Sequence, residues 1–265
     1  MRHRPVIAFA RTHLIQGLLV LLVLVVAEDI AARSDLFGLG PFLPPAGDVL
    51  AAWWRMTASG EMPDAIAVTL RGYVQGFLLS AVIGIALGTW MARSFVVSGL
   101  LTPIVEFLRP MPSAAIIPLA IVFFGIDDSM KRFVATYGAL WPILLNTWYG
   151  VRSADSQLVE IARMLRLGRL RTLFLVVLPA ASPFIMTGLR LGSIVTLGLV
   201  ITAELIASGD GLGYVIESEQ LAFKVPETYA GVLSVMLLGA SVNFAFYLVE
   251  KRLMRWHARM SRAAQ

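Results

Sequence analysis

Four charged residues interrupt apolar stretches of the sequence: Glu106, Arg109, Arg190 and Glu204. A charged side chain inside a membrane span is costly, so such residues usually face the protein interior or a water-filled path. Glu106 and Arg109 are three residues apart, a spacing that lets two side chains share one helix face and pair. For Glu106 and Arg190 we weigh two roles, and favour inter-helix pairing that fixes packing over contact with a transported solute.

Polar residues on the same stretches extend this set. The candidates for lining a translocation path are Glu106, Arg109, Tyr137, Asn146, Arg190, Ser193, Thr196 and Glu204. Hydroxyl and amide groups such as those of Asn146, Ser193 and Thr196 are more often packing hydrogen bonds than ligand contacts. The candidates are scattered along the chain and do not form one compact motif.

Catalysis and metal binding need groupings that the sequence lacks. There is no cysteine, and His3, His13 and His257 are near the chain ends without ligand spacing. No cluster of acids, histidine or serine offers acid–base or nucleophilic chemistry, so we expect no catalytic residue. A glycine-rich loop ending in Gly-Lys-Ser/Thr is also absent. We therefore expect no cofactor in this chain, and any ATP and magnesium would be bound by a partner.

Composition favours a membrane protein. Of 265 residues, 58% are hydrophobic and only 15% are charged, and the mean hydropathy is +0.77, beyond the range of ordinary soluble domains. The net charge of +5 is explained by arginine-rich loops on the cytoplasmic side of a membrane. No basic stripe interleaved with aromatic residues indicates nucleic acid as a partner.

The distribution of apolar runs predicts an all-α polytopic membrane protein with six transmembrane helices. The runs are Leu14–Ala27, Gly72–Ala92, Val96–Phe124, Phe133–Val151, Thr172–Ala203 and Tyr229–Val249. Lysine and arginine between alternate runs place both termini on the cytoplasmic side. The exceptions on the expected outer side are Arg33, Arg55, Arg71, Lys131, Arg132 and Lys224.

Glycine and proline add detail to these spans. Gly84 with Gly88, and Gly188 with Gly192, form two GxxxG pairs that let helices approach closely within one subunit. The third span contains Pro103, Pro110, Pro112 and Pro118, which predict kinks. Between the first two spans, Asp48 is expected to cap a short interfacial helix that carries Trp53 and Trp54.

One charged, amphipathic segment separates the fourth and fifth spans. Asp155 is a plausible N-cap, apolar residues follow it at helical spacing, and Gly168 fits the end of the helix. Five arginines surround the segment: Arg152, Arg163, Arg166, Arg169 and Arg171. We expect a short helix across the cytoplasmic face, with an apolar stripe that includes Leu158, Ala162 and Leu165.

This segment resembles the "EAA" loop of ABC-importer permeases. The resemblance rests on Glu160-Ile161-Ala162, a later glycine and Leu178-Pro179. Arg166 falls where the family has glycine, and Gly168 comes two residues later. In that family the loop is a coupling helix that docks on an ATPase subunit, which implies that role for Leu158, Glu160, Ile161, Ala162, Leu165, Arg166 and Gly168. The alternative is a surface helix that only joins two spans.

Further features follow the family's order from about Leu43 to Lys251. They include Thr69-Leu70-Arg71, Leu108–Pro112, Pro142–Thr147, Gly188-Leu189-Arg190, and Glu204 with Gly211–Tyr214. The chain thus resembles the nitrate/sulfonate/taurine/bicarbonate branch of type I importer permeases. The resemblance implies a non-enzymatic translocation subunit in the bacterial inner membrane, for a small organic or inorganic anion. The alternatives are thiamine or riboflavin precursors as substrates, or an autonomous secondary transporter or channel.

The resemblance also implies partners and a division of the chain. The partners are two cytoplasmic ATPase subunits, a second permease subunit, a periplasmic or lipid-anchored substrate-binding protein and the lipid bilayer. We expect a homodimer, with a sister permease as the alternative. Residues 1–63 would hold the cytoplasmic tail, first span and interfacial helix. Residues 64–252 would form the permease core, with its coupling loop at 153–171, and 253–265 a basic cytoplasmic tail.

Overall fold

The computed structural model describes residues 29–30 and 42–253, and all regular structure in these ranges is helical. The predicted first span, Leu14–Ala27, and the arginines of both tails lie outside the described residues. The chain divides into two compact units. One unit comprises Met1–Pro63 with Val215–Leu233, and the other comprises Asp64–Tyr214 with Ser234–Gln265.

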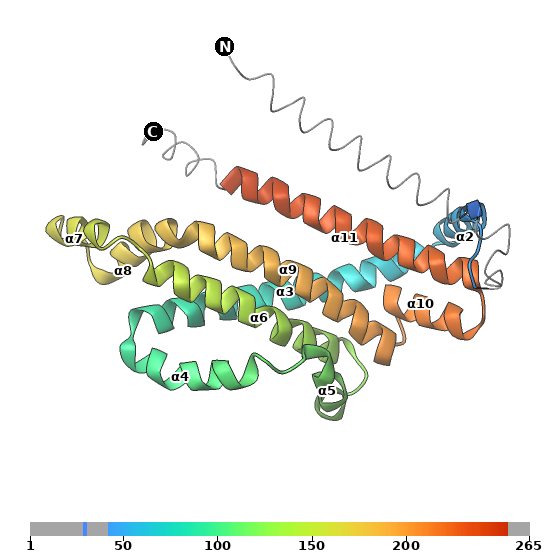
Figure 1. Ribbon diagram of the computed structural model, residues 1–265, viewed down its shortest axis with the longest axis horizontal. Helices are drawn as coiled ribbons and strands as arrows, with labels where there is room; N and C mark the ends of the chain where they lie inside the picture. Colours follow the sequence, from blue (N-terminus) through green and yellow to red (C-terminus); the bar gives the residue numbers. More distant parts are fainter. Residues whose placement is uncertain (1–28, 31–41, 254–265) are drawn as a thin grey trace, which may run out of the picture. The chain divides into compact units, whose positions relative to one another are not determined.

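The first unit contains α2 (Ala46–Ala58), labelled in Figure 1. Arg55 of α2 forms an ion pair of 2.8 Å with Glu227, near the start of α11 (Val225–Leu253). The prediction that Asp48 caps α2 is wrong. Pro45 is the N-cap and makes no side-chain capping bond, whereas Asp48 lies in the first turn. A carboxylate in the first turn is stabilised by the positive end of the helix dipole, although it accepts no capping hydrogen bond.

In the second unit, α6 (Asp128–Arg152) packs closely against α3 (Glu61–Arg93) and α9 (Leu178–Ala207). A Cβ atom on Gly84 of α3 would lie within 3.0 Å of Ile143. A Cβ atom on Gly88 would lie within 3.0 Å of Leu144 O and of Thr147. A Cβ atom on Gly188 or Gly192 of α9 would meet the same stretch of α6 within 2.8 Å. Both predicted glycine pairs therefore lie where a neighbouring helix backbone approaches too closely for a side chain.

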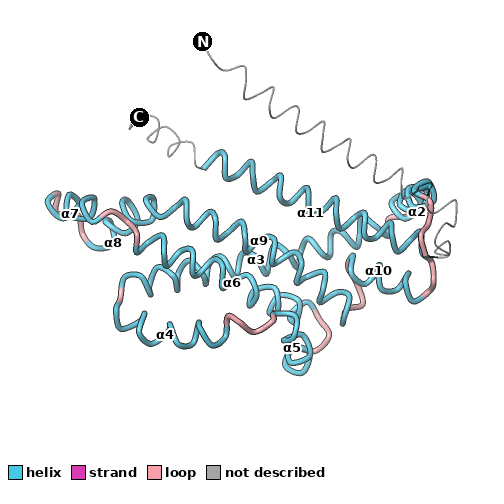
Figure 2. The backbone as a smooth tube through the Cα atoms, viewed as in Figure 1, coloured by secondary structure: helices cyan, strands magenta, loops and turns pink. Residues whose placement is uncertain are grey.

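The proline-rich span is broken. Helix α4 (Phe95–Leu108) and the segment η1 (Ser113–Ile116) with α5 (Ile117–Phe124) are bent by 89°, and Figure 2 shows the loop between them. Pro110 and Pro112 lie in that loop, which confirms a kink there. Pro103 lies inside α4 and Pro118 at the start of α5, where neither interrupts a helix.

Length and apolarity identify three described helical stretches that are able to cross a membrane. They are α3, the run Arg169–Leu221 that contains α9, and α11. The bent α4–α5 pair counts as a fourth if it forms one span. Helix α6 has 25 residues but does not meet the same apolarity test. Several described helices are thus long and apolar enough to cross a membrane, and the full six-span topology stays a prediction.

A short helical connection joins α6 to α9. It comprises α7 (Ser156–Met164), α8 (Arg169–Thr172) and the π-helical turn η2 (Leu173–Val177). From α8 to the end of α9 the chain runs on as one helical stretch, and only α7 is set apart by loops. Helix α7 is therefore the element of this connection that stands as a separate helix.

Candidate functional site

Helix α7 begins with a side-chain cap, as the sequence predicted. The Asp155 carboxylate accepts a hydrogen bond of 2.8 Å from the backbone N–H of Gln157. This bond satisfies one of the N–H groups that the first turn of a helix leaves without a partner. The start of the helix is thus fixed by the local sequence.

The end of α7 differs from the prediction. The helix stops at Met164, and Gly168 has ordinary φ and ψ of −64° and 158° as the N-cap of α8. Arg166 has φ of 54°, in the left-handed region. Its N–H bonds to Arg163 O and the N–H of Leu167 bonds to Ala162 O, at 2.9 and 3.0 Å. This pair of bonds is the Schellman motif, whose left-handed position glycine usually occupies. The expectation that Gly168 marks the end of the helix is therefore wrong.

The apolar residues of α7 face two directions. Leu158, Ile161 and Leu165 are 44%, 52% and 69% exposed, whereas Ala162 is buried. Placing Ala162 on the exposed stripe was wrong, because its position around the helix turns it toward the chain's own core. Leu158, Ile161 and Leu165, the C-cap residue, lie on one side of the helix and are called the α7 apolar stripe below; Met164 is also exposed but lies farther around the helix. Glu160 is exposed on the same helix.

The inward side of α7 anchors the helix to the bundle. Val159 packs against a buried cluster formed by Val151 of α6, Val177 of η2 and Ala181 of α9. Burial of these side chains stabilises the position of α7 through the hydrophobic effect. The α7 apolar stripe is therefore held on a packed base while its own side chains remain uncovered.

Glu204 forms a second candidate site near the end of α9. Its side chain is fully buried, and its carboxylate oxygens lie 2.8 and 3.0 Å from the Thr69 hydroxyl. It also accepts a 3.1 Å hydrogen bond from the N–H of Gly213, and the N–H of Leu212 donates to Thr69 Oγ1 at 2.9 Å. Gly211, with φ of 96°, lies against the carboxylate. We call Thr69, Glu204 and Gly211–Gly213 the α9 latch.

A nearby ion cluster surrounds Lys131 at the start of α6. Its ammonium group lies 2.7 Å from Asp210 and 3.0 Å from Asp128. Burial lowers the pKa of Lys131, but the two carboxylates outweigh this effect and leave the pKa above its ordinary value. Burial raises the pKa of Asp210, but the Lys131 ammonium and the Ser208 hydroxyl hold it below its ordinary value. The cluster fixes the loop after α9 against α6.

Other path candidates lie in helix-packing contacts. Ser193 shares a buried 2.7 Å hydrogen bond with Tyr73. Thr196 and Asn146 bond to backbone oxygens of their own helices, at Gly192 and Pro142. Tyr137 donates to Leu108 O at 2.8 Å. Hydrogen bonds of this kind are typical of side chains that pack helices together.

The charged candidates are more exposed. Arg190 lies 3.4 Å from Glu250 of α11, an inter-helix pair of the kind we favoured. Glu106 and Arg109 are both exposed, and no ion pair joins them in the described part of the chain. The pairing that their spacing permits is therefore not formed.

Sequence reasoning missed three residues of these sites. Thr69 was noted only as part of a family feature, Tyr73 was not singled out, and Lys131 was counted as an exception to the charge rule. That exception was itself a signal, because a lysine three residues after an aspartate, next to an apolar run, can form an ion pair that lets it be buried. Thr69 and Tyr73 carried no comparable signal, since their partners are more than 100 residues away.

Comparisons with known proteins identify a family and several relatives of this chain. Residues 82–255 match the family described as "Binding-protein-dependent transport system inner membrane component". A relative described as an aliphatic sulfonates transport permease protein, SsuC of Escherichia coli K12, is 34% identical over 215 residues, covering 81% of this chain and 82% of SsuC. The bicarbonate transport system permease protein CmpB of Synechococcus elongatus is 34% identical over 203 residues, covering 76% of this chain and 68% of CmpB.

Solved structures show a similar fold. A chain from inward-facing structures of the MetNI methionine ABC transporter matches with a TM-score of 0.62. The match covers 71% of this chain and 94% of that chain, at 17% sequence identity. At this identity the likeness concerns the arrangement of helices alone.

Proposed function

Because the chain belongs to the family of binding-protein-dependent transport system inner membrane components, we propose that it forms the translocation path of an ATP-driven importer. In this proposal it takes up a small anion of the sulfonate or bicarbonate type. It acts with two cytoplasmic ATPase subunits, a second copy of itself and an external substrate-binding protein. The chain hydrolyses no ATP and binds no cofactor of its own.

The α7 apolar stripe is the observation that carries the proposal. The three apolar side chains of the stripe stand exposed along one side of a short helix whose inward side is anchored in the core. An exposed apolar row on a firmly held helix suits insertion into a groove of another protein. We infer that the groove belongs to the ATPase subunit, and that α7 transmits movement from the ATPase to the spans.

The substrate class rests on the relatives. SsuC and CmpB are named for aliphatic sulfonates and bicarbonate, two kinds of small oxyanion. A path for such solutes needs polar or cationic groups, and Arg190, at the edge of a 650 Å³ cavity between α9 and α11, is one candidate. Uptake assays with radiolabelled methanesulfonate, taurine and bicarbonate would identify the substrate.

The coupling role is tested with a charged substitution in the stripe. Ile161→Glu should place a carboxylate in the apolar ATPase groove, where an unpaired charge is strongly unfavourable. Uptake into proteoliposomes driven by ATP should fall by at least about tenfold, a loss of 1.4 kcal/mol in coupling. The ATPase subunit should also co-purify less well, while the permease level in the membrane stays unchanged.

The matched control is Leu170→Glu, an exposed apolar position on α8 outside the stripe. It should leave uptake and ATPase association close to wild type. Ala162→Trp is unsuitable as a test, because Ala162 is buried and the larger side chain would disturb the chain's own packing. Normal uptake by Ile161→Glu would show that α7 is only a connection between spans.

A further inference from the structure

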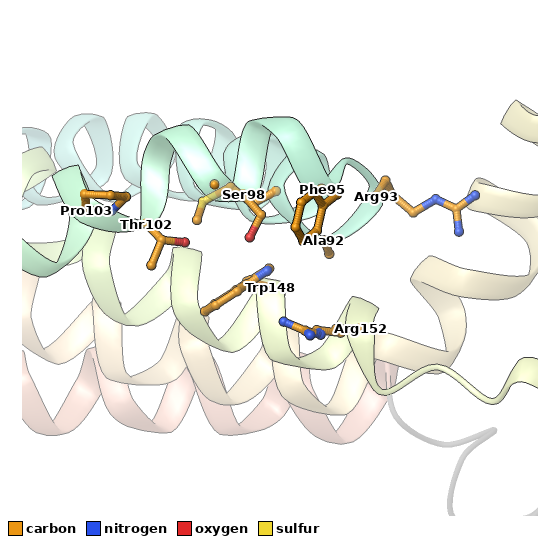
Figure 3. Close-up of a pocket in the computed structure, with 10 residues that line it drawn as sticks. Ala92, Arg93, Phe95, Ser98, Thr102, Pro103, Trp148 and Arg152 are labelled. Carbon is orange, nitrogen blue, oxygen red and sulfur yellow. The ribbon is translucent and has the colours of Figure 1, made fainter.

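A cavity between α4 and α6 combines hydrogen-bond donors with positive charge. Its volume is about 530 Å³, within the roughly 300–1,000 Å³ range of ligand sites. Figure 3 shows Ser98 and Thr102 on one wall, with Trp148 and Arg152 facing them from α6. No aspartate or glutamate is among its ten lining residues. The cavity therefore offers an environment for an anion.

The polar groups of this cavity have no hydrogen-bond or ion-pair partner among the described residues. Neither the Ser98 nor the Thr102 hydroxyl has a hydrogen bond to any described residue, and no described carboxylate pairs with Arg152. The indole nitrogen of Trp148 is buried, and no described residue accepts a hydrogen bond from it. Buried donors usually have a partner, so the unpaired Trp148 nitrogen beside two half-buried hydroxyls is unusual.

Arg152 is placed to supply the charge. Its guanidinium carbon lies 5.9 Å from the centre of the Trp148 ring, a cation–π distance that holds the side chain against the cavity wall. Its planar N–H groups match two oxygens of a carboxylate, sulfonate or phosphate at once. Arg93 also lines the cavity, but its side chain extends away from the other labelled residues.

We propose that this cavity binds an oxyanion head group, with Arg152 as the charged contact and Ser98 and Thr102 as further donors. The site is separate from the α7 apolar stripe and does not depend on the transported substrate. Two sources share the required chemistry: a small soluble oxyanion, or the phosphate of an anionic phospholipid. Exposed Phe95 at the cavity edge would suit the acyl chain of the lipid.

The test uses the purified full chain in nanodiscs, with thermal unfolding as the readout, since a ligand that binds the folded state raises Tm. In phosphatidylcholine nanodiscs the soluble probes are methanesulfonate and inorganic phosphate. In a second arm, phosphatidylglycerol replaces part of the phosphatidylcholine. We expect a saturable rise in Tm in at least one arm, and the responding arm identifies the source.

Arg152→Gln should require about tenfold more probe for the same rise. The matched control is Arg163→Gln, an exposed arginine that lines the neighbouring 250 Å³ cavity but not this one. It should titrate like wild type. Ser98→Leu places a larger apolar side chain in the cavity and should also abolish the rise in Tm. This variant tests the proposal if Arg152→Gln fails to fold. No rise in either arm, or an equal loss in Arg163→Gln, would overturn the proposal.

Discussion

The α7 apolar stripe and the α9 latch invert the usual placement of residues. In α7 and its C-cap, Leu158, Ile161 and Leu165 are apolar and exposed. In the latch, Glu204 and Thr69 are polar and completely buried, with hydrogen bonds to each other and to the following loop. Both regions lie in the same compact unit.

The difference separates two kinds of requirement. A buried polar group is tolerated because partners inside the chain satisfy its hydrogen bonds. The burial of the latch residues is therefore accounted for by contacts within one subunit. An exposed apolar row has no such explanation within the chain and indicates a surface to be covered. Substitutions in the latch should therefore damage folding, whereas substitutions in the stripe should damage association.

The largest expected effect is on the latch. Glu204→Ala removes the acceptor for the Thr69 hydroxyl and the Gly213 N–H, leaving two buried donors unpaired. Each unpaired donor costs about 1–3 kcal/mol, so the free energy of unfolding should fall by roughly 2–6 kcal/mol. Thermal unfolding of the purified chain in detergent measures this change.

Glu250→Ala provides the matched control for that experiment. Glu250 pairs with Arg190 at 3.4 Å in an exposed position, and exposed pairs contribute about 0–1 kcal/mol. If the Glu204 and Glu250 variants lost equal stability, burial would not distinguish the latch, and the comparison between the two regions would lose its basis.

An intermediate effect is expected at the Lys131 cluster. Lys131→Met removes a hydrogen-bonded charge from two carboxylates that remain partly in water, at a cost of about 2 kcal/mol. The folded-state pKa of Asp210 is lowered, so its contribution is present above its unfolded pKa and lost as pH falls through the folded value. The difference in Tm between wild type and Lys131→Met should therefore shrink below about pH 4. An unchanged difference at acidic pH would contradict the assigned ion pair.

The smallest expected effect is at the end of α7. Arg166→Gly removes the side-chain clash of the left-handed conformation, worth about 1 kcal/mol. Backbone amides of α7 should exchange with solvent more slowly in this variant. Arg163→Gly, inside the helix, should destabilise α7 by a similar free energy, so its amides should exchange faster. Slower exchange in both variants, or in neither, would argue against the Schellman end described here.

Local rules predicted much of this structure from the sequence. The Asp155 cap, the break at Pro110–Pro112 and the two GxxxG pairs depend on a few adjacent residues. Helical spacing also revealed that α7 is amphipathic. It did not reveal which apolar residues face inward, because that depends on where Val151 and Val177 lie in the fold.

Two other features could not be predicted from the sequence, for different reasons. Glycine is the residue that most often adopts the left-handed conformation at a helix end, which is why the sequence pointed to Gly168. The hydrogen bonds to Ala162 O and Arg163 O instead require the left-handed conformation two residues earlier, at Arg166. The partners of Glu204 include Thr69, 135 residues earlier in the chain. Only the packing of α3 beside α9 brings them together.

Site-specific photo-crosslinking tests the central claim about α7 most directly. A photoreactive residue would be placed singly at Leu158, Ile161 or Leu165, and at Arg163 as an exposed control about 140° around the helix from Leu158. In membranes that also contain the ATPase subunit, the three stripe positions should crosslink strongly to it, and Arg163 only weakly. Equal crosslinking at all four positions, or none at the stripe, would contradict the assignment of α7 as the surface that contacts the ATPase.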